Sequence, residues 1–90
     1  IYESQYQLLR TLNSQGPLTL EVIKVEHYTT FVALLSNETT PPSFNEWMRY
    51  LIEHMLVITN KDGLSCEITG NGVQFLNELK KTEVKEKFSN

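Results

Sequence analysis

Cysteine is nearly absent from this sequence of 90 residues. The single Cys66 can form no disulfide within the chain, and one thiolate cannot build a structural zinc site. Long hydrophobic runs are also missing, because no segment approaches the ~18 to 20 apolar residues that span a bilayer. The sequence therefore predicts a cytoplasmic, reducing environment and no membrane insertion by this chain.

Basic residues are scarce. Eight Lys and Arg residues face eleven Asp and Glu residues, for a net charge of -3 and an isoelectric point near 5.3. This balance argues against a protein whose main task is to neutralise phosphates. Residues 1 to 58 are acidic, with three basic side chains against six acidic ones, whereas residues 59 to 90 hold five of each.

The length is that of one small domain. A hydrophobic content of 40% and nine aromatic residues can supply one compact core and not two. The chain opens on Ile1 rather than Met and lacks the pattern of a signal peptide, so we expect a trimmed piece of a longer protein.

The first 35 residues show helical spacing of apolar side chains. One face is predicted to hold Tyr2, Tyr6, Leu9 and Leu12, in a helix that stops before Gly16. A second helix should start near Thr19, a plausible N-cap, and carry apolar residues on two sides. Residues 18 to 25 are rich in β-branched side chains, so a short strand there is an open alternative.

The clearest start signal follows the proline-rich break at residues 37 to 42. Ser43 and Glu46 match a capping box. In this motif the serine side chain accepts from the backbone amide of the glutamate, and the glutamate side chain accepts from the backbone amide of the serine. The predicted core side of this third helix contains Phe44, Trp47, Met48, Leu51, Ile52, Met55 and Leu56. The opposite side contains Asn45, Glu46, Arg49, Tyr50, Glu53 and His54.

A β-hairpin is predicted next. Residues 57 to 59 and 64 to 68 read as strands, and the Asp62-Gly63 pair favours a tight turn. Thr69 then caps a last helix, whose apolar pattern thins past Lys80. We expect one domain over residues 1–82 and a charged helix end or tail over 83–90.

The stretch from Ser43 to Lys81 resembles the third helix, wing and closing helix of bacterial winged helix modules. Their wing-to-helix pattern corresponds here to Ile68, Thr69, Gly72, Phe75 and Leu76. The threonine caps the helix and the glycine permits close backbone approach. The resemblance implies an α+β, mostly helical domain with three helices, a two-stranded β-hairpin wing and a C-terminal helix.

The sequence offers few residues for a catalytic or metal site. His27, His54 and Cys66 show no recognised metal-ligand spacing. Ser43 is better used as a helix cap than as a nucleophile with His54. The sequence therefore predicts no enzyme, no metal, no cofactor and no small-molecule substrate.

Two functions remain open. The favoured one is a protein-interaction or dimerisation module within a larger protein, since exposed aromatic residues are enriched in protein contacts. Its candidate interface residues are Tyr2, Tyr6, Tyr28, Tyr50 and Phe88. The alternative, implied by the winged helix resemblance, is DNA binding through Arg49, Lys61, Lys80 and Lys81. It is disfavoured because Glu46 and Glu53 accompany Arg49 on the helix, and Asp62 accompanies Lys61 on the wing.

Overall fold

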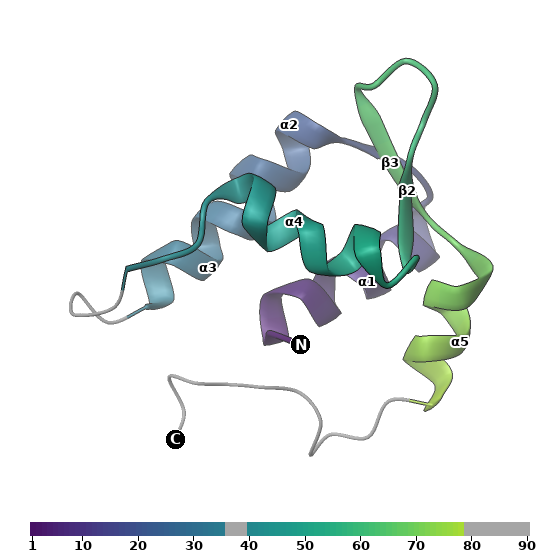
Figure 1. Cartoon of the computed structure of the whole chain (residues 1–90), viewed down its shortest axis with the longest axis horizontal. Helices are drawn as coiled ribbons and strands as arrows, with labels where there is room; N and C mark the ends of the chain where they lie inside the picture. The colour runs from purple at the N-terminus through teal and green to yellow at the C-terminus, as the bar shows by residue number, and fades with distance from the viewer. Residues whose placement is uncertain (36–39, 79–90) are drawn as a thin grey trace.

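Four helical segments and a small sheet form the described part of the chain, residues 1–35 and 40–78 of a computed structural model (Figure 1). The helical elements are α1 (Glu3–Gln15), α2 (Leu20–Ile23), the π-helical η1 (Lys24–Tyr28), α3 (Thr29–Leu34), α4 (Phe44–Glu53) and α5 (Gly70–Glu78). Because α2, η1 and α3 follow one another without a break, they form one helical stretch. The strands are β1 (Leu18–Thr19), β2 (Val57–Thr59) and β3 (Ser65–Ile68).

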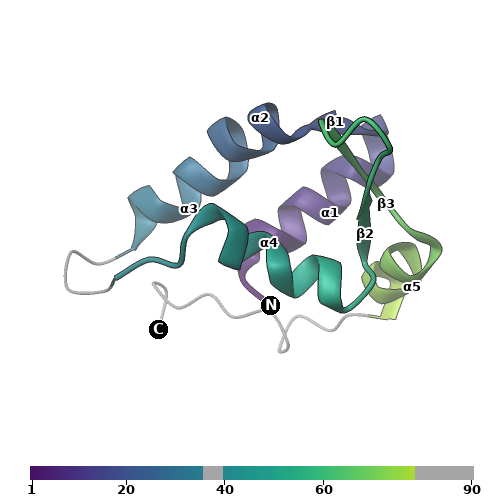
Figure 2. The ribbon, with the colours of Figure 1, turned by 45° about the horizontal axis from the view of Figure 1, so that its top comes forward.

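The α+β prediction is confirmed, and the arrangement is compatible with a winged helix. Figure 2 shows the α2–α3 stretch and α4 on either side of α1, with the hairpin and α5 at one end. The predicted boundary between residues 82 and 83 lies outside the described residues.

The wing contains one strand more than the sequence predicted. The sheet has the order β1-β3-β2, and both pairings are antiparallel. Leu18 pairs with Cys66 and Thr19 with Ser65, so the strand left open by the sequence exists. The helix prediction also holds, because the Thr19 hydroxyl oxygen accepts from the Val22 amide at 3.2 Å and α2 begins at Leu20.

The core lies where α1, the α2–α3 stretch, α4 and the sheet meet. Its buried side chains are Leu8, Leu9, Leu12, Ile23, Phe31, Trp47, Met48, Leu51, Leu56, Val57 and Cys66. In the α2–α3 stretch only Ile23 and Phe31 are fully buried, while Val25 and Leu34 are exposed. The expectation of two buried apolar sides for that helix is therefore only partly met.

The end of α4 departs from the predicted pattern. The helix ends at Glu53, and Met55 adopts a left-handed backbone with φ of 58°. The Leu56 amide donates to the Leu51 carbonyl at 2.9 Å, and the Met55 amide donates to Ile52 at 3.0 Å. These two bonds are those of a Schellman motif, which stops a helix. The prediction that Ile52 and Met55 face the core is wrong, because Ile52 lies on the exposed side of α4 and Met55 follows the end of the helix, where the chain turns away.

The junction between the sheet and α5 follows the predicted pattern. The Thr69 hydroxyl oxygen accepts from the Gly72 amide at 3.0 Å, and the hydroxyl itself donates to the Met55 carbonyl. A Cβ on Gly72 would lie 2.3 Å from the Leu56 carbonyl oxygen and 2.5 Å from Cγ1 of Ile68. The glycine therefore permits α5 to approach the chain that links α4 to the sheet.

We expect Gly72→Ala to lower the free energy of unfolding by about 2 kcal/mol, because the added methyl group forces backbone apart in a packed region. Urea denaturation measures this loss. The control is Gly70→Ala in the same helix, where a Cβ meets nothing within 4 Å. Equal stability of the two variants would contradict the close approach at Gly72.

Candidate interaction site

Hydrogen bonds through two side chains hold the start of α1 against α4. Gln5 is 2% exposed, and its amide nitrogen donates to the Trp47 carbonyl oxygen at 2.8 Å. Its amide oxygen accepts from the Tyr2 backbone amide at 2.9 Å. In return, Nε1 of Trp47 donates to the Ser4 hydroxyl oxygen at 3.1 Å. These bonds leave no polar atom of the Gln5 or Trp47 side chain unpartnered, and they position α4.

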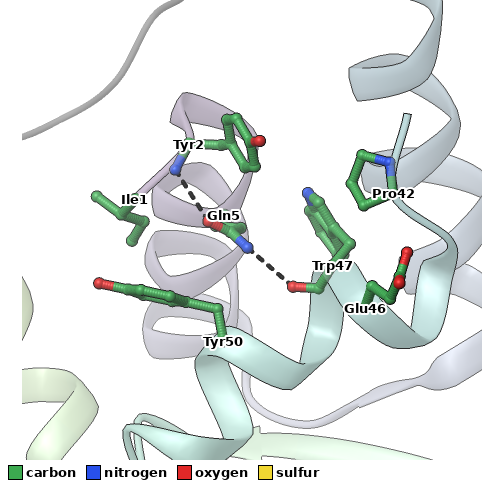
Figure 3. A pocket seen from close by; sticks show the side chains of 7 residues that line it. All are labelled: Ile1, Tyr2, Gln5, Pro42, Glu46, Trp47 and Tyr50. Carbon is green, nitrogen blue, oxygen red and sulfur yellow. Dashed lines mark hydrogen bonds between the residues drawn. The ribbon is translucent and has the colours of Figure 1, made fainter. Parts of the chain in front are cut away.

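A groove of about 400 Å³ lies beside these contacts. Its lining residues, shown in Figure 3, are Ile1, Tyr2, Gln5, Pro42, Glu46, Trp47 and Tyr50. We call it the α1–α4 groove. Aromatic and aliphatic side chains make most of its wall, and Glu46 supplies the one carboxylate of the lining. Since a dry cavity of about 150 Å³ can hold a benzene ring, the groove has room for an aromatic side chain with its neighbours.

The structure brings two of the five predicted interface residues together, since Tyr2 and Tyr50 both line the α1–α4 groove. Tyr50 stacks on His54 with the ring centroids 4.2 Å apart. Tyr6 lies apart from them, in a mainly polar hollow between α1 and α5, with the Arg10 guanidinium 5.7 Å from its ring centroid.

Tyr28 packs against other residues of the domain. Its hydroxyl donates to the Pro42 carbonyl, and its ring meets Phe44 and Trp47 edge-on at 5.5 and 5.8 Å between centroids. The hydroxyl and much of the ring are thus engaged within the domain. Phe88, the fifth predicted interface residue, lies outside the described residues.

Two of the four residues of the DNA-binding alternative lie in the described part of the chain. Arg49 on α4 and Lys61 in the wing turn are exposed, whereas Lys80 and Lys81 lie outside the described residues. On α4, Glu46 and Glu53 are exposed together with Arg49, as the sequence predicts.

Asp62, next to Lys61, shapes the wing turn. Its Oδ1 accepts from the Leu64 and Ser65 amides at 2.8 and 3.3 Å. Gly63 in this turn has φ of 70°, as the Asp-Gly pair suggests. The acidic side chain of the turn therefore has a structural role beside the cation.

Exposed apolar side chains mark the end of α4 and the wing. They are Ile52 (45% exposed), Met55 (64%), Ile58 (53%) and Leu64 (66%). Ile58 lies opposite Glu67, whereas Leu64 alternates with Cys66 and lies on the other face of the hairpin, so we call Ile52, Met55 and Ile58 the wing surface. Apolar spacing did not predict this surface, because it placed Ile52 and Met55 on the core side of the third helix, whereas Ile52 is exposed on α4 and the helix ends before Met55. The sequence did contain a sign that the helix ends early: only Leu56 separates Met55 from the predicted strand at Val57, so the helix cannot continue for another turn.

Met55 combines exposure with backbone strain. Its left-handed φ is the position of a Schellman motif that glycine usually takes, because a side chain there costs roughly 1 kcal/mol. The thioether is nevertheless 64% exposed, so core packing does not account for methionine at this position. Strained residues cluster at functional sites, which directs attention to the wing surface.

The described ranges, 1–35 and 40–78, contain no group of three or more His, Cys, Asp or Glu side chains placed to hold a metal ion. The Ser43 hydroxyl oxygen accepts from the Glu46 amide at 3.1 Å, and Oε1 of Glu46 accepts from the Ser43 amide at 2.9 Å. Ser43 is thus a helix cap, as predicted.

Desolvation lowers the pKa of His27, although nearby Glu26 opposes the effect.

Cys66 is fully buried in β3, and burial, with a smaller contribution from Glu67, raises the pKa of its thiol to about 11. A thiol in this position is a poor nucleophile and a poor metal ligand, because both roles need the thiolate.

We expect the free energy of unfolding to fall as the pH rises from about 9 towards 11, because the folded state keeps the Cys66 proton that the unfolded chain releases. Urea denaturation at a series of alkaline pH values measures this slope. Cys66→Ala provides the reference, since it lacks the thiol and should lose less stability over the same range. Parallel curves for the two proteins would contradict the raised pKa.

Comparison of the chain with protein-family models, curated proteins and solved structures finds no match. Within the described part of the chain, no helix is both long enough and apolar enough to cross a membrane. The candidate interaction surfaces are thus a groove at the start of α1 and exposed apolar side chains at the wing.

Proposed function

We propose that this chain is a non-catalytic protein-interaction module of winged helix type, which acts in the cytoplasm and binds a second copy of itself through the wing surface. The observation that carries the proposal is Met55, an exposed apolar side chain kept at a strained backbone position. A side chain that the fold does not need there is explained if a partner covers it.

The wing also offers a way to make the contact symmetric. β2 is an edge strand in the order β1-β3-β2, and it carries the exposed Ile58. An exposed edge presents backbone amides and carbonyls to another chain, here over the three residues of β2. Two β2 edges can meet across a two-fold axis, which is the commonest symmetry of homodimers. In this arrangement, Met55 and Ile58 of each copy would lie near the shared edge.

Charge supports a protein partner over DNA. In a DNA-reading winged helix, the third helix and the wing present cations to phosphates and bases. The exposed side of α4 instead presents two carboxylates with Arg49, and in the wing turn Asp62 directly follows Lys61 in the sequence. Two exposed cations on these elements would give only weak, salt-sensitive DNA binding.

We expect the full chain to form a dimer in sedimentation equilibrium, and Ile58→Ser to weaken its dissociation constant by about tenfold, or ~1.4 kcal/mol. Met55→Gly should weaken the dimer to a similar degree while leaving the free energy of unfolding unchanged or raised by up to about 1 kcal/mol. The control is Leu34→Ser, which removes an exposed apolar side chain of α3, far from the wing surface (Figure 1). It should leave the dimer unchanged.

A chain that stays monomeric at every accessible concentration would refute this dimer. Fluorescence anisotropy of random duplex DNA at low salt tests the alternative on the same samples. DNA binding that disappears with Arg49→Glu and Lys61→Glu, in a monomeric chain, would establish the DNA-binding function instead.

A further inference from the structure

The three sulfur atoms of the chain have different surroundings. The sequence has two methionines and one cysteine, and all three lie in the described ranges. Met48 is 4% exposed and Cys66 is fully buried, whereas Met55 is 64% exposed. Burial also raises the pKa of the Cys66 thiol to about 11, so little of the thiolate that peroxides attack exists at neutral pH. An oxidant in solution therefore reaches the sulfur of Met55 first.

The backbone holds Met55 in place without using its side chain. The Met55 amide donates to the Ile52 carbonyl at 3.0 Å, and the Met55 carbonyl accepts from the Thr69 hydroxyl. The thioether takes no part in these bonds, and it lies outside the buried core. A change at the sulfur should therefore alter the wing surface and leave the free energy of unfolding unchanged.

The residue type at this position is informative. A left-handed backbone strongly disfavours β-branched side chains, so an apolar residue other than glycine is best unbranched at Cβ, as leucine and methionine are. Methionine differs from leucine in its thioether, which oxidants convert to a sulfoxide. The reaction turns a flexible apolar side chain into a polar one.

The oxidation needs a peroxide and no group of the protein other than the thioether. The sulfur of Met55 attacks one oxygen of hydrogen peroxide, so that an S–O bond forms as the O–O bond breaks. The sulfur loses two electrons, and the peroxide is reduced. The second oxygen leaves as hydroxide and takes up, through solvent, the proton of the transferred oxygen, which gives the sulfoxide and one water molecule.

We propose that Met55 is a reversible oxidation site, and that its sulfoxide weakens the contact between two copies of the chain. The inference rests on the proposed dimer. In that dimer the sulfoxide oxygens would lose water beside Ile52 and Ile58, whose side chains have no hydrogen-bond donor. The same contact covers the thioether, so peroxide reacts mainly with the monomer. Association and oxidation therefore oppose each other.

Hydrogen peroxide added to the full chain, at a concentration where most of the protein is monomeric, tests the site. Peptide mapping by mass spectrometry should find the added oxygen on Met55 well before Met48 or Cys66. Sedimentation equilibrium of the oxidised protein should then give a dimer dissociation constant raised by about tenfold. Methionine sulfoxide reductases for both epimers, with a dithiol that becomes a disulfide as water is released, should restore the original constant.

Two variants assign the effect to one sulfur atom. Met55→Leu has an apolar side chain that peroxide does not oxidise, so its dissociation constant, whatever its starting value, should be the same before and after treatment. Met48→Leu removes the buried thioether of the core instead, and this variant should respond to peroxide as the parent protein does.

The outcomes separate this inference from the dimer itself. Oxidation of Met48 or Cys66 as fast as Met55, or an effect that the reductases cannot reverse, would overturn the assignment of the site. A dimer that is unchanged when Met55 is fully converted to sulfoxide would overturn the inference and leave the proposed function standing. A chain that is monomeric before peroxide is added would refute the dimer, and this inference with it.

Discussion

The attachment of α1 to α4 through Trp47 is the contact on which the rest of the domain depends. The indole is 1% exposed, donates to Ser4 and packs near Phe31, Phe44 and Tyr28. The backbone carbonyl of the same residue accepts from the buried amide of Gln5. One residue therefore joins three helical segments, and a buried polar group that lost its partner here would cost about 1 to 3 kcal/mol. The α1–α4 groove exists because these contacts keep the start of α1 beside α4.

The early end of α4 explains the second surface. Had the helix continued, Met55 would have turned inward with the other apolar residues. The Schellman bonds at Leu56 instead redirect the chain into β2, and Gly72 lets α5 pack close to this turn. The turn leaves Met55 outside the core, beside Ile52 on the exposed side of α4. Packing at one junction thus decides both the direction of the wing and the exposure of the wing surface.

The two surfaces differ in chemistry as well as place. The groove is concave, lined mainly by aromatic and aliphatic side chains, and bordered by the Glu46 carboxylate. The wing surface consists of separate aliphatic side chains beside a free sheet edge, which suits a symmetric contact between copies.

Local patterns in the sequence determined the helices, their caps and the hairpin. Ser43, Thr19 and Thr69 act as caps because capping needs only a side chain within three residues of the amide it binds. The exposure of Met55, the pairing of Leu18 with Cys66 and the burial of Gln5 depended on the tertiary structure. Each of them is set by partners distant in sequence or by a chain reversal that periodicity does not encode. The same reason applies to the groove, whose lining comes from the start of α1, from Pro42 and from α4, segments that only folding brings together.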